Sequence, residues 1–152
     1  MAHDQGLNYP NRKAAGQDLA ARLGDLAGRG DTLVLALPRG GLPVAAEVAR
    51  ALGAPLELRG KCVVLVDDGI ATGAMMEAAA MAARAMGAAP VVIAVPVAAP
   101  DTMARLAAHA DRIVCPQQQA GFMAVGQFYE SFPQISDEEV VEQLAMGNAR
   151  TT

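Results

Sequence analysis

Four short apolar runs, none with alternating polar residues, most constrain how this chain of 152 residues can fold. They are TLVLAL (32–37), CVVLV (62–66), PVVIAVP (90–96) and RIVC (112–115). A strand with one side in water alternates apolar and polar residues, whereas a strand covered on both faces reads as a continuous apolar run. The runs therefore predict a mostly parallel sheet of about four strands.

Helix-like segments separate these runs. Leu19, Leu23 and Leu26 recur at helical spacing within residues 11 to 28, which predicts a first helix that Gly28 can end. A capping box of Ser136 and Glu139 opens a last helix. The other predicted helices lie between the runs, at 43–53, 73–86 and 101–110. The alternation of strand and helix predicts a three-layer α/β/α fold, in a single domain spanning 1–152.

Residues 73 to 86 and 116 to 133 differ from the rest of this pattern. The first segment is composed mainly of alanine and methionine, so we expect that helix to be buried nearly all round. The second has no clear periodicity, and we expect it to be irregular.

Composition and charge limit the classes of binding partner and the cellular compartment that we expect for this protein. A formal charge of −4 and a pI near 5.1 give no general attraction to nucleic acid or to an anionic membrane. The apolar stretch 74–99 contains charged residues and a proline, so we expect no membrane span. Without a secretory signal, Cys62 and Cys115 read as reduced thiols of a cytoplasmic protein. His3 and His109 add no ligand cluster, so we expect no protein metal site.

Two adjacent acids and a small-residue loop follow the second run, in DDGIATGAM (67–75). Ligands of open parallel sheets bind beyond the carboxyl ends of the strands. The N–H groups of 71–74 would open into a helix N-terminus, which suits a phosphate. Asp67 and Asp68 would repel that phosphate, so they favour a ligand that also carries hydroxyls or a cation, as a sugar phosphate does. A plain turn followed by a plain helix cap is the alternative.

A second loop, PRGG (38–41), follows the first run at the same predicted end of the sheet. Arg39 is its cation, and Gly40 and Gly41 leave backbone N–H groups accessible. Arginine is the natural partner of a second phosphate group. Alone, this would be a surface arginine in a tight turn; together with the loop at 67–75 it favours a ligand with two phosphate sites.

These motifs resemble a known family. VVLVDDGIATGA is similar to the motif with which type I phosphoribosyltransferases bind phosphoribosyl pyrophosphate (PRPP). LALPRGGLPVAAEVARALGAPL resembles the first strand, pyrophosphate loop and following helix of that family. The resemblance extends over nearly the whole chain, to a bacterial subgroup of small phosphoribosyltransferases. It implies a Rossmann-like core and the transfer of phosphoribosyl to a nucleobase-like acceptor, with pyrophosphate as co-product.

The resemblance also implies a role for each loop residue. Asp67 and Asp68 would contact the ribose hydroxyls, Arg39 would face the pyrophosphate, and these three would be the catalytic residues. Mg²⁺ would be carried by the oxygen atoms of PRPP. The further PRPP-binding residues would be Gly40, Gly41, Gly69, Ala71, Thr72, Gly73, Ala74 and Met75.

Residues 116–133 stand where the family has the hood that covers the base. Phe122, Met123 and Phe128 are candidates to stack on a base, or else they only seal the edge of the sheet. The sequence favours neither alternative.

The chain departs from the family before the PRPP motif. Family members carry an insert with an edge strand and a mobile loop that closes over the reacting centre, whereas here only APLELRGK (54–61) separates Gly53 from the second run. A parallel crossover needs roughly a dozen residues, so PLEL is a lead-in to the second run or a stub at one edge rather than a full strand. The sheet then keeps a bared edge where a second copy could pair. Three functions stay open: a phosphoribosyltransferase, a non-catalytic PRPP-binding module and an interaction domain.

Overall fold

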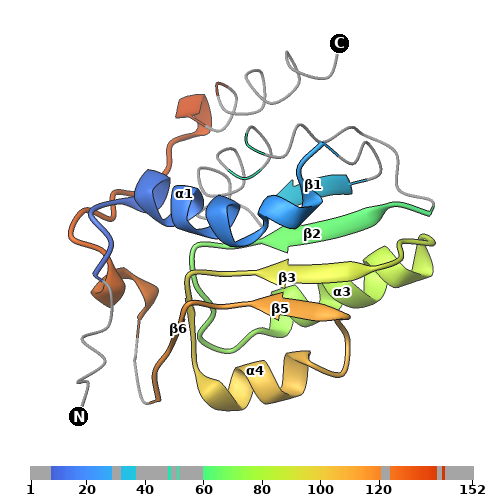
Figure 1. Cartoon of the computed structure of the whole chain (residues 1–152). Helices are drawn as coiled ribbons and strands as arrows, with labels where there is room; N and C mark the ends of the chain where they lie inside the picture. The colour runs from blue at the N-terminus through green and yellow to red at the C-terminus, as the bar shows by residue number, and fades with distance from the viewer. Residues whose placement is uncertain are drawn as a thin grey trace.

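A four-stranded parallel sheet forms the centre of the computed structural model (Figure 1). The structure describes residues 8–28, 32–36, 48, 51, 60–120, 124–139 and 142. The strand order is β1-β2-β3-β5, and the bounds are β1 (Thr32–Ala36), β2 (Cys62–Val66), β3 (Val91–Ala94) and β5 (Arg112–Val114). The predicted parallel sheet is confirmed. β3 excludes the prolines that flank its predicted run, because a proline has no N–H to donate to a neighbouring strand.

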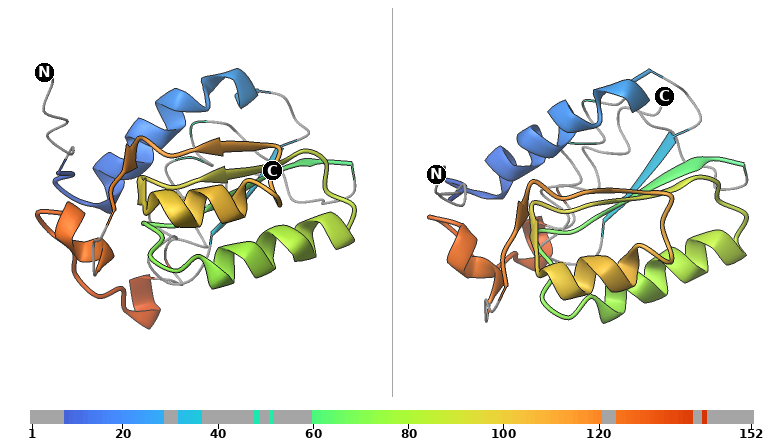
Figure 2. Two further views of the ribbon diagram at one scale, coloured as in Figure 1. Left: turned by 90° about the horizontal axis from the view of Figure 1, so that it is seen from below. Right: turned by 60° about the horizontal axis from the view of Figure 1, so that its bottom comes forward.

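Helices cover both faces of this sheet, so the predicted three layers are also confirmed (Figures 1 and 2). On one face lie α1 (Arg12–Arg22) and the short 3-10 helix η1 (Gly24–Leu26). On the other lie α3 (Ala74–Ala85) and α4 (Pro100–Leu106). None of the helices in the described residues has the length and apolar character needed to span a membrane.

The two sides of each strand supply two separate cores. On β2, Val64 and Val66 pack with the leucines of α1 and η1. Val63 and Leu65, on the opposite side, pack with buried residues of α3 and α4. All five residues of β2 are buried, which is why its sequence shows no alternation.

Helix α3 is more exposed than its composition predicts. Met75 is 64% exposed and Met81 55% exposed, and Met86, just beyond the helix, is 62% exposed. Its buried residues are Met76, Ala80 and Ala83. The expectation of burial nearly all round is wrong, because α3 is an outer layer that meets the sheet with one side.

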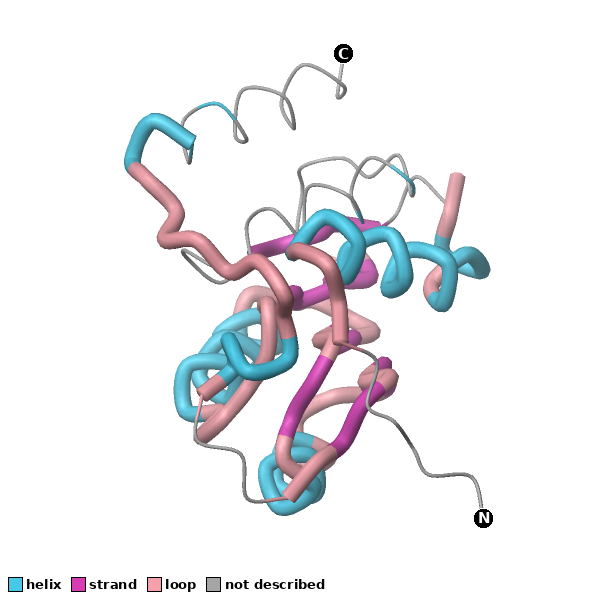
Figure 3. Tube along the Cα trace, turned by 90° about the vertical axis from the view of Figure 1, so that its left-hand side faces the viewer, coloured by secondary structure: helices cyan, strands magenta, loops and turns pink. Residues whose placement is uncertain are grey.

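Residues 116–133 contain more regular structure than expected. β6 (Gln117–Gln118) pairs in parallel with β4 (Val97–Ala98), and a 3-10 helix, η2 (Val125–Phe128), follows. Figure 3, in which the carboxyl ends of the main strands face the viewer, shows this small second sheet beside the end of the main one. An isolated bridge joins Ile70 to Ala98, so the small sheet also touches the loop after β2.

Several predictions concern residues outside the described ranges. Val48 and Ala51 are helical, and the rest of the predicted helix 43–53 lies outside the described residues. So do the PRGG loop (38–41) and the PLEL segment (55–58), and the bared edge is therefore untested. The cap at Ser136 is confirmed, since its Oγ accepts a hydrogen bond of 3.1 Å from the N–H of Glu139.

Candidate functional site

The two adjacent acids lie directly after β2, at the carboxyl end of the sheet. Their environments differ: Asp68 is 8% exposed, whereas Asp67 is partly exposed. The Oδ1 of Asp67 accepts a hydrogen bond of 2.8 Å from the N–H of Asp68. The two carboxyl groups are therefore held side by side, with Asp67 nearer to solvent.

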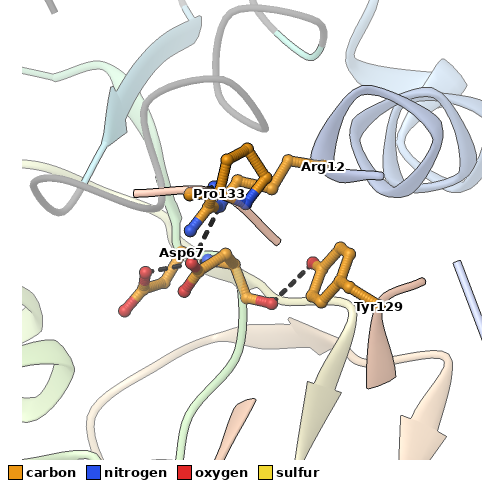
Figure 4. Close-up of polar contacts among 5 residues, drawn as sticks. Arg12, Asp67, Tyr129 and Pro133 are labelled. Atoms are coloured by element: carbon orange, nitrogen blue, oxygen red, sulfur yellow. Dashed lines mark hydrogen bonds and ion pairs between the residues drawn. The ribbon is translucent and has the colours of Figure 1, made fainter. Parts of the chain in front are cut away.

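A buried arginine from the other end of the chain neutralises Asp68. The Nε of Arg12 lies 3.2 Å from the Oδ2 of Asp68, and Arg12 is only 7% exposed. The Nη1 of Arg12 donates to the carbonyl of Pro133 at 2.5 Å (Figure 4). The guanidinium also stands 3.8 Å from the centroid of the Phe132 ring. Its charge thus meets a carboxylate, a carbonyl and an aromatic face.

The sequence interpretation missed Arg12, although one local signal was present. Asn11 caps α1, so Arg12 occupies the first helical position, and no acid stands in the first turn. The positive end of the helix dipole disfavours a cation there. An arginine at such a place indicates a compensating anion elsewhere in the fold.

Protonation of Asp67 follows from this arrangement. Burial, together with the neighbouring charge of Asp68, raises the pKa of Asp67 to about 8. A side-chain hydrogen bond to Asp68 acts in the same direction, and the charge of Arg12 opposes it. The raised pKa favours the neutral form of Asp67, which can donate a hydrogen bond as well as accept one.

The loop between Asp68 and α3 is held by its carbonyl groups. Tyr129 donates to the carbonyl of Asp68 at 2.7 Å, and Thr102 donates to that of Ala71 at 2.9 Å. Arg105 donates to the carbonyl of Thr72. The peptide groups of the loop are therefore oriented by helix α4 and by the segment after η2.

In the second half of this loop, the backbone N–H groups of 71–73 have no protein acceptor within the described ranges, whereas that of Ile70 donates to the carbonyl of Val97. The first N–H groups of α3 have no intrahelical partner. Gly73 is the N-cap of α3, with φ of 78° in the left-handed region. Ala71 and Thr72 are exposed. The arrangement presents several donors to an anion at a helix N-terminus.

The two glycines of the loop are also required by packing. A Cβ on Gly69 would stand 2.5 Å from the Cγ1 of Val125, and a Cβ on Gly73 would stand 2.6 Å from the Cγ2 of Thr102. Both distances are too short for real contacts. Helices η2 and α4 can approach the loop this closely only because these residues lack side chains.

The structure brings together part of the predicted site. The residues of 67–75 named as PRPP contacts all lie at one sheet end, ahead of α3 or in its first turn. Arg39, Gly40, Gly41, Phe122 and Met123 lie outside the described residues. Phe128 is 9% exposed and packs with Tyr9, Val97 and Tyr129, an environment that favours the alternative of sealing the sheet edge.

Comparison with known proteins gives a consistent result. Residues 54–129 match the model of the phosphoribosyl transferase domain. Two proteins of Mycobacterium tuberculosis, from strains CDC 1551 and H37Rv and provisionally named phosphoribosyl transferases, are each 36% identical over 205 residues. The match covers 90% of this chain and 46% of each relative, so the chain spans about half the length of these curated relatives. Because the 205 aligned positions exceed the 152 residues here, the relatives contain residues in this region without a counterpart.

Solved structures share the fold. The TT1426 protein of Thermus thermophilus has a TM-score of 0.81 and 30% identity, covering 90% of this chain and 97% of that one. A purine phosphoribosyltransferase of Pyrococcus horikoshii has a TM-score of 0.57 and 23% identity, covering 83% of this chain and 93% of that one. The second likeness bears on the fold alone.

Proposed function

This chain belongs to the phosphoribosyl transferase domain family, and on that premise we propose that it binds PRPP and transfers its phosphoribosyl group to a nitrogenous base. One observation supports this most strongly. At one end of β2, an acidic pair lies beside the N–H groups of 71–73, for which the described residues offer no acceptor. A ligand with vicinal hydroxyls and a nearby phosphate matches both features.

In this proposal different residues of the loop contact different groups of the ligand. The N–H groups of 71–75, with the Thr72 hydroxyl, hold the 5′-phosphate, and the ribose hydroxyls lie on the side of the acidic pair. Ala36 at the end of β1 pairs with Val66 at the end of β2. The chain therefore leaves both strands at one level, which supports assigning Arg39, Gly40 and Gly41 to the pyrophosphate.

The reaction itself needs little covalent chemistry from the protein. A ring nitrogen of the base attacks C1 of the ribose, the bond from C1 to pyrophosphate oxygen breaks, and pyrophosphate leaves with the electron pair. The proton of the attacking nitrogen passes to water or to the departing pyrophosphate. Positive charge develops at C1 in the transition state, while the old bond breaks and the new one forms. Orientation of the two reactants and stabilisation of the departing charge provide the acceleration.

Magnesium fits this scheme as part of the substrate. In the described part of the chain, no three His, Cys, Asp or Glu side chains gather to hold a metal ion. One of the two acids in the site is paired with Arg12. That donor set suits Mg²⁺ that would be carried by the oxygen atoms of PRPP, where it would neutralise pyrophosphate charge.

A second function, a PRPP-binding module without transfer, is favoured by one specific observation. The relatives carry residues in the aligned region that this chain lacks. Loss of a closing segment would leave the ligand site open to water and the pyrophosphate less well held. Binding would then persist without turnover.

Calorimetry with Mg²⁺-PRPP tests binding, and pyrophosphate release with a panel of bases tests transfer. We expect binding that is lost in the double variant Asp67→Asn/Asp68→Asn and retained in Asp101→Asn, a matched exposed carboxylate on α4. Pyrophosphate release with any base establishes the enzyme, and binding without release establishes the module. Absence of binding at millimolar PRPP contradicts both.

A further inference from the structure

Arg12, a buried arginine far from the acidic loop in sequence, contacts one of the two acids and not the other. We propose that Arg12 is a positioning residue: it commits Asp68 to an internal ion pair and leaves Asp67 as the carboxyl group that meets the hydroxyls of the ligand. The proposal deepens the function proposed above and rests on it for the nature of the ligand. We call Arg12, Asp68, Tyr129, Phe132 and Pro133 the Arg12 clasp.

The clasp joins three parts of the chain at one point. Arg12 opens α1, Asp68 follows β2, and the other members come from the segment after η2. The Arg12 side chain is 8% exposed and that of Asp68 is 12% exposed. Two charges so far from water persist only as a pair, so neither is free to serve a ligand without leaving the other uncompensated.

Tyr129 holds Asp68 from the opposite direction. Its hydroxyl donates to the Asp68 carbonyl at 2.7 Å, and its ring lies 4.9 Å from that of Phe132, centroid to centroid. Burial raises the pKa of Tyr129, so its hydroxyl keeps the proton it donates. Asp68 is therefore fixed through both its side chain and its backbone.

The backbone of the N-terminal segment reinforces the clasp. The N–H of Tyr9 donates to the carbonyl of Phe128 at 3.0 Å, and the N–H of Glu130 donates to the carbonyl of Tyr9 at 2.8 Å. The N–H of Ser131 donates to the carbonyl of Pro10 at 3.0 Å. Residues 9–12 and 128–133 thus form one unit that covers Asp68.

Asp67 differs from Asp68 in its exposure and in its lack of a cationic partner within the described part of the chain, although its Oδ1 accepts a hydrogen bond from the N–H of Asp68. It is partly exposed, and it makes no ion pair with Arg12 among the described residues. Burial raises the pKa of Asp67 most, the charge of Asp68 raises it further, and the charge of Arg12 lowers it. The clasp therefore contributes to the protonation of Asp67 as well as fixing the position of its neighbour.

A titration without ligand tests the electrostatic part of this proposal. The Asp67 carboxyl ¹³C resonance is followed against pH in the wild type and in variants. Arg12→Met should move the Asp67 midpoint upward, because a cation is lost, and Asp68→Asn should move it downward, because an anion is lost. Arg12→Lys should restore the wild-type midpoint. Arg22→Met, which removes an exposed arginine of the same helix, should leave it unchanged.

Both opposite shifts are required. If neither Arg12→Met nor Asp68→Asn moves the midpoint, or both move it in one direction, the proposal is overturned. Should Arg12→Met not fold, Asp68→Asn and Arg12→Lys still decide, since a downward shift in the first and an unchanged midpoint in the second are both expected.

Calorimetry with Mg²⁺-PRPP tests whether Asp67 contributes more to ligand affinity than Asp68 does. We expect Asp67→Asn to weaken binding more than Asp68→Asn does, and Arg12→Met to weaken it about 10- to 100-fold through misplacement of the site. Arg12→Lys should recover most of the affinity. Equal or greater loss in Asp68→Asn contradicts the proposal. If the wild type does not bind PRPP, the proposed function fails, while the ligand-free titration still decides the role of Arg12.

Discussion

The two ends of the parallel sheet each carry an arginine–aspartate pair, and the two pairs have opposite character. At the amino end, the Nη2 of Arg84 lies 2.8 Å from the Oδ2 of Asp111, and both side chains are more than 40% exposed. At the carboxyl end, Arg12 and Asp68 are 3.2 Å apart and almost fully buried. The shorter contact should cost less to break, because water screens the exposed pair and cannot replace a lost partner in the buried pair.

The two ion pairs also differ in the part of the structure that each one holds in place. The amino end joins helix α3 to the start of β3 through Asp111, whose Oδ2 also accepts from the N–H of Val91 at 2.8 Å. That arrangement stabilises a strand start. The carboxyl end instead holds the buried pair of Arg12 and Asp68 beside the N–H groups of 71–73, which donate to no group in the described part of the chain, and this is the ligand site proposed above.

Removing the arginine of each pair should give the largest difference in stability between the two ends of the sheet. Arg12→Met leaves the Asp68 charge buried and unpaired, and we expect a loss of about 3 to 5 kcal/mol in the free energy of unfolding. Arg84→Met should cost about 0 to 1 kcal/mol. Urea denaturation measures both. Equal costs at the two ends would contradict the assignment of the buried pair.

Two glycines with positive φ, one near each end, give a second contrast. A Cβ added to Gly73, with φ of 78°, would stand 2.6 Å from Thr102, whereas one added to Gly60, with φ of 72°, would meet open space. Gly60→Ala should cost about 1 to 2 kcal/mol for the left-handed backbone alone. Gly73→Ala should cost about 1 to 3 kcal/mol more through overlap with α4. Thermal unfolding of the two variants provides the comparison, and a smaller cost at Gly73 would argue against tight packing of the loop.

The pH dependence of stability should have opposite signs at the two ends. The folded-state pKa of Asp67 is raised to about 8 from 3.8, so its contribution is fully present below pH ~4 and is lost as pH rises towards 8. The pKa of Asp111 is lowered, chiefly by the Val91 N–H, so its contribution is present above the unfolded pKa and is lost as pH falls.

Asparagine variants separate these contributions. We expect Asp67→Asn to raise the midpoint of thermal unfolding relative to wild type at pH 9 more than at pH 4. Asp111→Asn should lower it at pH 7 more than at pH 3, by about 2 to 4 °C for each kcal/mol lost. A reversed order for either residue would show that its ionisation is not controlled by these contacts.

The sheet and the loop after β2 could be predicted from sequence because both are local patterns. A buried parallel strand needs a continuous apolar run. The run CVVLV therefore predicts the strand, and the two acids and small residues that follow it predict the loop. The exposure of α3 could not be predicted in this way, because alanine and methionine suit a buried or an exposed helix face equally.

The role of Arg12 was beyond local patterns for a different reason. Its partner Asp68 is 56 positions away, and the pair forms only when α1 folds back over the end of the sheet. The same holds for Tyr129, which is 61 positions from the carbonyl that it contacts. Long-range contacts of this kind depend on topology, whereas the helix dipole at Arg12 gave only an indirect indication.

The most direct test of the proposed PRPP site is a ³¹P NMR spectrum of Mg²⁺-PRPP with the wild-type protein, before and after addition of a panel of bases. We predict that the 5′-phosphate resonance shifts or broadens with the wild type and is unaffected by Asp67→Asn/Asp68→Asn. For a transferase, free pyrophosphate then grows in when the accepted base is added. A PRPP spectrum that the wild type leaves unchanged at millimolar concentrations would contradict the assignment of this loop as a PRPP site.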